Sequence, residues 1–317
     1  MKSFFSKDPT QTNTMVYLQS FDLMTRQREE NFLMNFPRTC FDSYYPMGIF
    51  SFGKQLHHLE FNDVTIFCGG NGSGKSTLLN IIAEKLKLKR QTCFNKTYFF
   101  DPYLDGCCYK ICTEAATTLK DWRAVSRIIT SDDVFNHIID VRRKNEDISV
   151  RRSVIFEEKE RFNRYGIDGL TNRPRSIDTN DPESLKAFAF YRDIIKKSAS
   201  RMVRDHVGME ERTYSNGENG YKYFTKAIQP GGLYLLDEPE NSLSAEMQLE
   251  LMHFLHGMVR YYQCQFILSS HSPFLLCLPD ARIYNMDAEP VRTCKWTELP
   301  NVRIYHDFFE DHQSEFI

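Results

Sequence analysis

The sequence has no apolar run that approaches the length of a membrane-spanning helix, so a helical membrane protein is not expected. Residues 1–14 are polar and lack the apolar stretch of a signal peptide. The formal net charge is only -2, so the chain has no overall basic excess of the kind that marks nucleic-acid-binding domains, although a local basic face is still compatible with it. These absences predict a cytoplasmic protein.

Metal-binding and repeat patterns are absent as well. The nine cysteines include no C-x-x-C spacing, and the densest group, Cys107, Cys108 and Cys112, has no histidine nearby. The sequence therefore does not support a zinc site, and buried reduced thiols fit the pattern better. The chain also lacks an internal repeat and a sustained heptad pattern, which argues against a long coiled-coil arm.

The most informative stretch that is present reads GGNGSGKS at residues 69–76, with the spacing G-x-x-x-x-G-K-S. An apolar run at 64–67 precedes it and a helical pattern, Thr77–Lys85, follows it. This strand–loop–helix context is typical of a phosphate-binding loop, in which glycines let the backbone turn several N–H groups inward. The pattern therefore predicts a nucleotide-binding site.

The loop predicts individual roles. Lys75 would reach the β- and γ-phosphates of ATP, and Ser76 would hold Mg²⁺. The helix that begins near Lys75 adds its positive dipole end. The residues expected to bind the nucleotide here are Gly69, Asn71, Gly72, Ser73, Gly74, Lys75, Ser76 and Thr77.

Two more apolar runs end in residues suited to catalysis. Residues 233–238 read LYLLDE, and the two carboxylates at the end of an apolar strand need a chemical reason. Asp237 would complete the Mg²⁺ site, and Glu238 would polarise or position the attacking water. Residues 265–273 read QFILSSHSP, in which His271 would contact the γ-phosphate and sense its loss.

A fourth element, SNGEN at residues 215–219, precedes a helical stretch, Tyr221–Ile228. The Ser215 hydroxyl, the Gly217 backbone N–H and a helix N-terminus form a second anion site. One pocket does not need two γ-phosphate sites from the same chain, so these two residues are expected to close on the ATP of another molecule.

The remaining pattern gives the expected elements. Strands are predicted over Met15–Leu23, Ile49–Phe52, Leu56–Phe61 and Thr97–Phe100. Helical structure is predicted over Glu114–Arg164, Pro182–Val207 and Ser244–Tyr262, and a loop over Tyr165–Ser184. After residue 283 we expect a short strand pair followed by a helix, Tyr305–Phe316.

In this order, GGNGSGKS, SNGEN, LYLLDEPE and SSHSP resemble the ABC-type ATPase superfamily over about residues 48–290. The chain is more similar to the soluble RecF- and SMC-like ATPases of recombination and repair than to transporter subunits. Three features indicate this: the signature reads SNGEN instead of LSGGQ, Ser244 replaces a D-loop aspartate, and the Q-loop candidate, Gln91, is poor. Adenine is expected to stack on an aromatic ring; Tyr45, Phe50 and Phe52 are candidates, although each also fits core or turn packing.

The resemblance implies an α/β P-loop NTPase of ABC type, with an N-terminal antiparallel β subdomain and an inserted helical lobe. Residues 1–14 are expected to be a flexible tail and 15–317 a single domain. Within it, 15–113 and 215–290 would form the nucleotide-binding core, 114–214 the helical lobe, and 291–317 a C-terminal extension.

Three functions stay open at this point. The first is an ATP-hydrolysing switch that dimerises head-to-tail around ATP and Mg²⁺, linked to nucleic acid or phage defence through a separate effector. The second is the ATP-binding subunit of a transporter with a separate membrane partner. The third is a non-hydrolysing scaffold, against which the intact Lys75, Asp237, Glu238 and His271 argue. DNA-stimulated ATPase activity would separate the first from the other two.

Overall fold

The computed structural model describes residues 15–36, 41–112, 122–171, 181–207, 215–241 and 243–316. The expected flexible tail, 1–14, lies outside these ranges. The chain divides into two compact units: the first comprises residues 1–135 and 215–317, and the second comprises residues 136–214.

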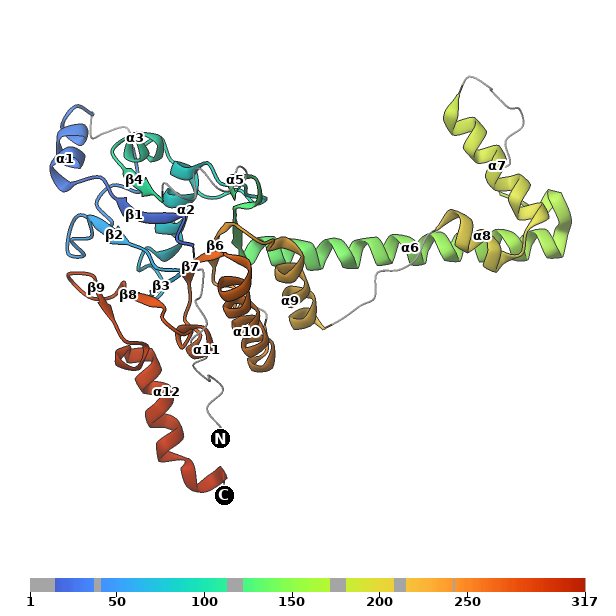
Figure 1. The fold of residues 1–317 in the computed structure, drawn as a ribbon. Helices are drawn as coiled ribbons and strands as arrows, with labels where there is room; N and C mark the ends of the chain where they lie inside the picture. The colour runs from blue at the N-terminus through green and yellow to red at the C-terminus, as the bar shows by residue number, and fades with distance from the viewer. Residues whose placement is uncertain are drawn as a thin grey trace. The chain divides into compact units, whose positions relative to one another are not determined.

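The first unit is organised around a six-stranded sheet (Figure 1). In spatial order its strands are β5 (Arg127–Thr130), β6 (Leu233–Asp237), β7 (Gln265–Ser269), β3 (Val64–Cys68), β8 (Arg282–Asn285) and β9 (Arg292–Cys294). All neighbours run parallel except β9, which is antiparallel to β8. The central strands read as continuous apolar runs because both faces of a parallel sheet are buried, and every residue of β3 and β7 is buried.

The register of this sheet brings three strand ends to one edge. Phe67 on β3 lies opposite Ser269 on β7, and Ser269 lies opposite Asp237 on β6. The loops that follow β3, β6 and β7 therefore meet at the carboxyl edge, which is where open parallel sheets bind ligands.

A second, antiparallel sheet is built from β2 (His58–Glu60), β1 (Leu18–Asp22) and β4 (Cys108–Ile111), in that order. Gln265 on β7 ties this sheet to the first: its side chain accepts a hydrogen bond from the Leu18 amide at 2.8 Å and donates one to the Leu18 carbonyl at 2.9 Å. The predicted N-terminal antiparallel subdomain is confirmed.

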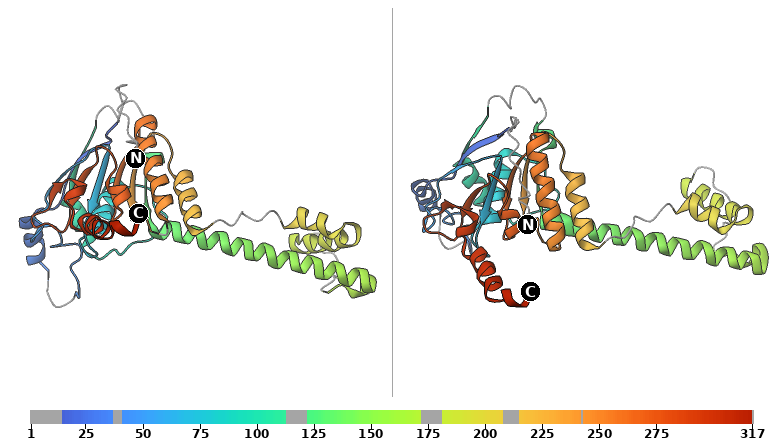
Figure 2. Two further views of the ribbon diagram at one scale, coloured as in Figure 1. Left: turned by 90° about the horizontal axis from the view of Figure 1, so that it is seen from below. Right: turned by 60° about the horizontal axis from the view of Figure 1, so that its bottom comes forward.

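Helices cover the six-stranded sheet. α2 (Lys75–Leu86) packs against β5, β6 and β7 through buried aliphatic side chains, and α10 (Ala245–Tyr262) contacts β7. α9 (Asn216–Ala227) lies beside α10 in both views of Figure 2. The other helices of the first unit are α1 (Arg26–Met34), α3 (Phe100–Asp105), α5 (Trp122–Val125), α11 (Pro273–Leu276) and α12 (Pro300–Asp311), with short 3-10 turns η2 (Trp296–Glu298) and η3 (Gln313–Phe316).

The second unit is helical. The 35-residue helix α6 (Ser131–Tyr165) runs into it, followed by η1 (Gly166–Gly169), α7 (Pro182–Lys196) and α8 (Ala199–His206). A small apolar core of its own holds the unit together, made of Ile155, Leu170, Ile194, Met202 and Val207. The predicted inserted helical lobe is therefore present, and its compact part begins at residue 136.

Several local predictions are wrong. Ile49–Phe52 forms turns instead of a strand, and the strand predicted at Thr97–Phe100 is a turn that leads into α3. The helical segment predicted from residue 114 contains the strand β5, whose Ile128 and Ile129 are both buried in the sheet. A short apolar pair of this kind has no period that distinguishes a buried strand from a helix. The helix predicted over Pro182–Val207 is interrupted where Lys197 and Ser198 take extended conformations.

Candidate functional site

The loop between β3 and α2 has the conformation that its glycines allow. Gly72 and Gly74 take positive φ angles, +79° and +93°, which residues with a Cβ rarely adopt. Gly74 is the N-cap of α2, and a Cβ there would lie 3.1 Å from Ile49 and from Phe50. The loop is thus shaped by both backbone conformation and close packing, and it leaves the N-terminus of α2 facing the edge of the sheet where the three strands end.

Lys75 lies buried under this loop. Its Nζ donates to the carbonyls of Gly69 at 2.7 Å and Gly70 at 3.1 Å, and lies 3.9 Å from Glu238 Oε1. The Ser73 hydroxyl is buried and has no hydrogen-bond partner within the described part of the chain. A buried cation and a buried, unpaired hydroxyl in one glycine-rich loop fit a bound phosphate chain.

Ser76 and Asp237 come together from α2 and β6. Ser76 Oγ donates to Asp237 Oδ1 at 3.0 Å, and Ser269 Oγ donates to the same oxygen at 2.5 Å. Burial raises the pKa of the Asp237 carboxyl, while the hydrogen bonds from Ser269 and Ser76 act in the opposite direction. A hydroxyl beside a largely buried carboxylate is an oxygen-only donor pair that suits Mg²⁺, which would also offset the cost of burying that charge.

Glu238 and His271 face each other across the ends of β6 and β7. His271 Nε2 lies 3.5 Å from Glu238 Oε1, and Asn241 Nδ2 donates to Glu238 Oε2 at 3.0 Å. Glu238 has a left-handed backbone with φ +47°, held by hydrogen bonds from its amide to the carbonyl and hydroxyl oxygens of Ser269. Such strained positions concentrate at functional sites because the surrounding structure must impose them.

Ser215 and Gly217 lie elsewhere in the first unit, at the start of α9. Ser215 is the N-cap of this helix and forms a capping box with Glu218, in which the Glu218 amide donates to Ser215 Oγ at 3.3 Å. Ser215 is exposed, and among the described residues its hydrogen bonds stay within its own cap and helix. The structure therefore brings Lys75, Ser76, Asp237, Glu238 and His271 together, while Ser215 and Gly217 belong to the separate N-terminus of α9.

Two polar contacts near the phosphate loop are not predicted from the sequence. Asp287, just after β8, accepts the Gly70 amide with both carboxylate oxygens at 2.9 and 2.8 Å. Tyr45 donates its hydroxyl to Thr77 Oγ1 at 3.1 Å, which ties the segment before β2 to the first turn of α2. Tyr45 is expected from the sequence only as an aromatic candidate for adenine, and Asp287 is 217 positions from Gly70, so no spacing rule predicts either contact.

The aromatic candidates for adenine differ in exposure. Phe50 is buried against the phosphate loop and Tyr45 is bonded to Thr77, whereas Phe52 is 51% exposed with the Arg26 guanidinium 4.8 Å from its ring centre. Gln91, the poor Q-loop candidate, accepts a hydrogen bond from Tyr223 of α9 at 2.8 Å. Phe52 is thus the most exposed of the three rings, and the Arg26 guanidinium lies over it.

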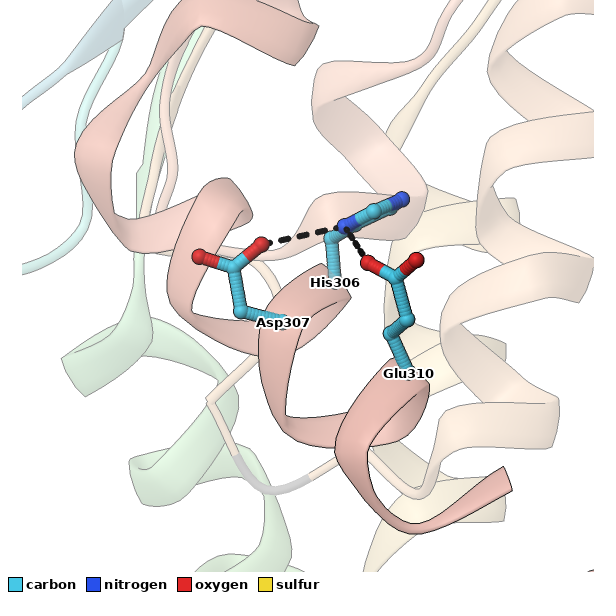
Figure 3. A group of neighbouring side chains, drawn as sticks. All are labelled: His306, Asp307 and Glu310. Carbon is cyan, nitrogen blue, oxygen red and sulfur yellow. Dashed lines mark hydrogen bonds and ion pairs between the residues drawn. The ribbon is translucent and has the colours of Figure 1, made fainter. Parts of the chain in front are cut away.

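Another group of potential metal ligands lies on α12 (Figure 3), where the His306 ring nitrogen faces the carboxylates of Asp307 and Glu310 at 3.1 and 3.7 Å. All three side chains are exposed and come from consecutive turns of one helix. Exposed groups of this kind are common without an ion, so we assign no metal to them.

Replacing Gly74 by alanine is expected to lower the free energy of unfolding by about 1–3 kcal/mol, because the new Cβ meets Ile49 and Phe50 at a positive φ. Gly257 on α10 is the matched control, since a Cβ there meets nothing within 4 Å. Gly257→Ala should raise the free energy of unfolding by up to about 1 kcal/mol. Urea denaturation measures the free energy of unfolding of both variants. If the two substitutions change it equally, the loop geometry is contradicted.

Comparison with known proteins gives one match over more than half of the chain. The family model described as ABC transporter matches residues 57–241 of the 317. A second model, whose description names an AAA domain, the AbiEii toxin and a Type IV TA system, matches residues 224–276. No curated protein matches the chain. In the described residues, no helix is both long and apolar enough to cross a membrane.

Solved structures resemble the chain at low identity. One is the Smc head domain of Pyrococcus furiosus, with an extended coiled coil and bound to the C-terminal domain of ScpA (13% identity, 92% of this chain and 99% of that chain, TM-score 0.40). Another is a dimeric ATP-binding cassette in a post-hydrolysis state, bound to ADP and Pi (13% identity, 75% of this chain and 88% of that chain, TM-score 0.33). A third is a metal-chelate type ABC transporter in an inward-facing conformation (14% identity, 77% of this chain and 77% of that chain, TM-score 0.35). All three TM-scores lie below 0.5, so the family assignment rests on the family model.

Proposed function

Because the chain belongs to the ABC-type ATPase family, we propose that it binds Mg-ATP on the loop at 69–76, hydrolyses it, and uses the cycle as a conformational switch. The observation that carries this proposal is the meeting of five side chains at one edge of the sheet. These side chains come from three different segments and form two contact groups, which are joined through consecutive residues of the chain. Ser76 bonds to Asp237 at 3.0 Å, and Glu238 lies 3.9 Å from Lys75 and 3.5 Å from His271.

Each residue has a distinct task in the proposed reaction. Lys75 leaves the carbonyls of Gly69 and Gly70 and pairs with the β- and γ-phosphates. Ser76 and Asp237 are the residues that would hold Mg²⁺, and the ion would supply positive charge to neutralise the charge that develops on the phosphates. Glu238 positions the attacking water and accepts its proton, while His271 donates to the γ-phosphate.

Ser215 and Gly217 explain why a second molecule is needed. Both residues lie at the N-terminus of α9, where Ser215 is the exposed N-cap, and a helix N-terminus is suited to an anion. In the proposed dimer each chain places this terminus on the γ-phosphate held by the other, so that two ATP molecules are enclosed in a symmetric, head-to-tail pair. ATP and ADP then favour different states, as a switch requires.

Within the family we assign the chain to the RecF- and SMC-like branch, with a role in nucleic-acid processing or phage defence through a separate effector. The SNGEN signature and Ser244, which caps α10 through the Met247 amide, support this assignment over the transporter alternative. The match to a family described with a toxin of a Type IV TA system is consistent with a defence role. Stimulation of ATP hydrolysis by added DNA tests the link to nucleic acid.

Ser215→Arg is the experiment for the dimer. The bulky cation should block closure, so ATP-dependent dimerisation and hydrolysis should both fail, while the monomer still binds ATP because Lys75 and Ser76 are unchanged. Ser198→Arg is the matched control, since Ser198 is an exposed N-cap serine on α8, outside the site. Light scattering with and without Mg-ATP and a phosphate-release assay give the two readouts.

Mixing variants tests whether the site is shared. Ser215→Arg and Lys75→Ala chains together can form one composite site, with intact Lys75 from one chain and intact Ser215 from the other, and so regain part of the activity. Normal hydrolysis by Ser215→Arg alone would contradict the head-to-tail arrangement.

A further inference from the structure

Three donors converge on one oxygen of Glu240, just beyond the proposed catalytic carboxylate. Glu240 Oε1 accepts the His271 amide at 2.5 Å, the Ser270 hydroxyl at 2.9 Å and the Ser272 amide at 3.2 Å. Its other oxygen, Oε2, is buried and has no hydrogen-bond partner within the described residues. Burying a carboxylate in this way is costly unless several donors compensate it, so this contact defines the path of the loop after β7.

The same turn also fixes Glu238. The Asn241 amide donates to the Glu238 carbonyl at 3.1 Å, and the Asn241 side chain donates to Glu238 Oε2 at 3.0 Å. Within the segment 238–241, Asn241 therefore holds the Glu238 carboxylate, while Glu240 accepts a hydrogen bond from the His271 backbone. The two groups that it positions, Glu238 Oε1 and His271 Nε2, lie 3.5 Å apart.

Contacts from other elements restrain the loop less directly. Asn301 Nδ2 reaches the His271 carbonyl at 3.4 Å, which is long for a hydrogen bond. Ser272 caps the short helix α11 and donates its hydroxyl to Gln248 at 2.7 Å, which fixes the residue after His271 but not the His271 amide. Among the described residues, Glu240 is the group that bonds to the amides of both His271 and Ser272.

We propose that Glu240 is a positioning residue, which locks the backbone of His271 relative to Glu238 so that imidazole and carboxylate reach the reacting γ-phosphate and water together. This inference rests on the proposed function of the site. Since a displacement of about 1 Å in a catalytic group can reduce the rate by about a hundredfold, a carboxylate without direct contact to the nucleotide can still control turnover.

The test is a double-mutant cycle in the full-length protein. Glu240→Ala should lower kcat for ATP hydrolysis by about 10- to 100-fold with KM within about threefold of wild type. If Glu240 acts through His271, Glu240→Ala combined with His271→Ala should be no slower than His271→Ala alone. Glu240→Gln keeps an acceptor oxygen and should recover much of the lost rate, and Glu250→Ala, which removes an exposed glutamate from α10, should change nothing.

A second measurement does not depend on hydrolysis. Hydrogen exchange of the nucleotide-free protein, followed in peptides that cover 268–276, should be faster in Glu240→Ala at the amides of His271 and Ser272, and near wild type in Glu240→Gln. A wild-type protein that does not hydrolyse ATP overturns the proposed function. If the wild type does hydrolyse ATP, additive losses in the cycle or unchanged exchange overturn the role of Glu240 alone.

Discussion

A Lys75→Ala variant should bind Mg-ATP about 10- to 100-fold more weakly than the wild type. The Lys75 ammonium is buried beneath the loop, where it has little competition from water, and it is within reach of the loop carbonyls that border the expected phosphate position. A hydrogen bond between charged groups contributes about 1.5–3 kcal/mol, and each 1.4 kcal/mol changes affinity tenfold. Titration with a fluorescent ATP analogue in the presence of Mg²⁺ measures the change directly.

Two controls separate lost phosphate contacts from a damaged loop. Lys186→Ala removes the same charge from an exposed position on α7 and should leave ATP affinity unchanged. Because Lys75 donates to Gly69 and Gly70 without nucleotide, its removal also takes donors from two carbonyls, so the thermal stability of the nucleotide-free variant must be compared with that of wild type. If a stable Lys75→Ala protein binds Mg-ATP as well as the wild type does, the assignment of this loop is wrong.

The parts of the fold that the sequence predicts correctly are those encoded by contiguous residues. β3, β6 and β7 are five-residue, mostly apolar strands that end at a motif, and α2 and α10 are helices of 12 and 18 residues. In the structure these three strands are parallel, and their ends, with the motifs, meet at one edge of the sheet.

The parts that the sequence misses depend on contacts between distant segments. β5 is only four residues long and becomes a strand because β6 lies beside it, so its own sequence does not distinguish it from helix. The hydrogen bonds from Gly70 to Asp287 and from Tyr45 to Thr77 join residues 217 and 32 positions apart, and no spacing rule predicts such contacts. Glu240 is visible in the sequence as part of LYLLDEPE, but its bonds to the His271 loop follow only from the three-dimensional path of the two loops.

Glu238→Gln should lower the rate of ATP hydrolysis by about a hundredfold or more and leave ATP binding intact. Glu238 Oε1 lies 3.5 Å from His271 Nε2 and 3.9 Å from Lys75 Nζ, so its carboxylate borders the place where the γ-phosphate and the attacking water are expected. Glutamine has nearly the same shape and can still accept the hydrogen bond from Asn241, but its amide cannot accept a proton from water. The variant therefore removes the chemistry of this residue and preserves its packing.

The same variant should reveal the dimer, because ATP that is bound but not hydrolysed keeps the two chains closed. Light scattering of Glu238→Gln at saturating Mg-ATP should give twice the monomer mass, and the monomer mass should return when the nucleotide is removed. Glu246→Gln, at an exposed glutamate in the first turn of α10, should behave like the wild type in both assays. Unchanged steady-state hydrolysis by Glu238→Gln would move the catalytic role to another group, with His271 the nearest candidate. A variant that loses hydrolysis but stays monomeric with ATP would instead retain the catalytic assignment and refute the closure around two nucleotides, since Ser215 and Gly217 would then have no phosphate to meet.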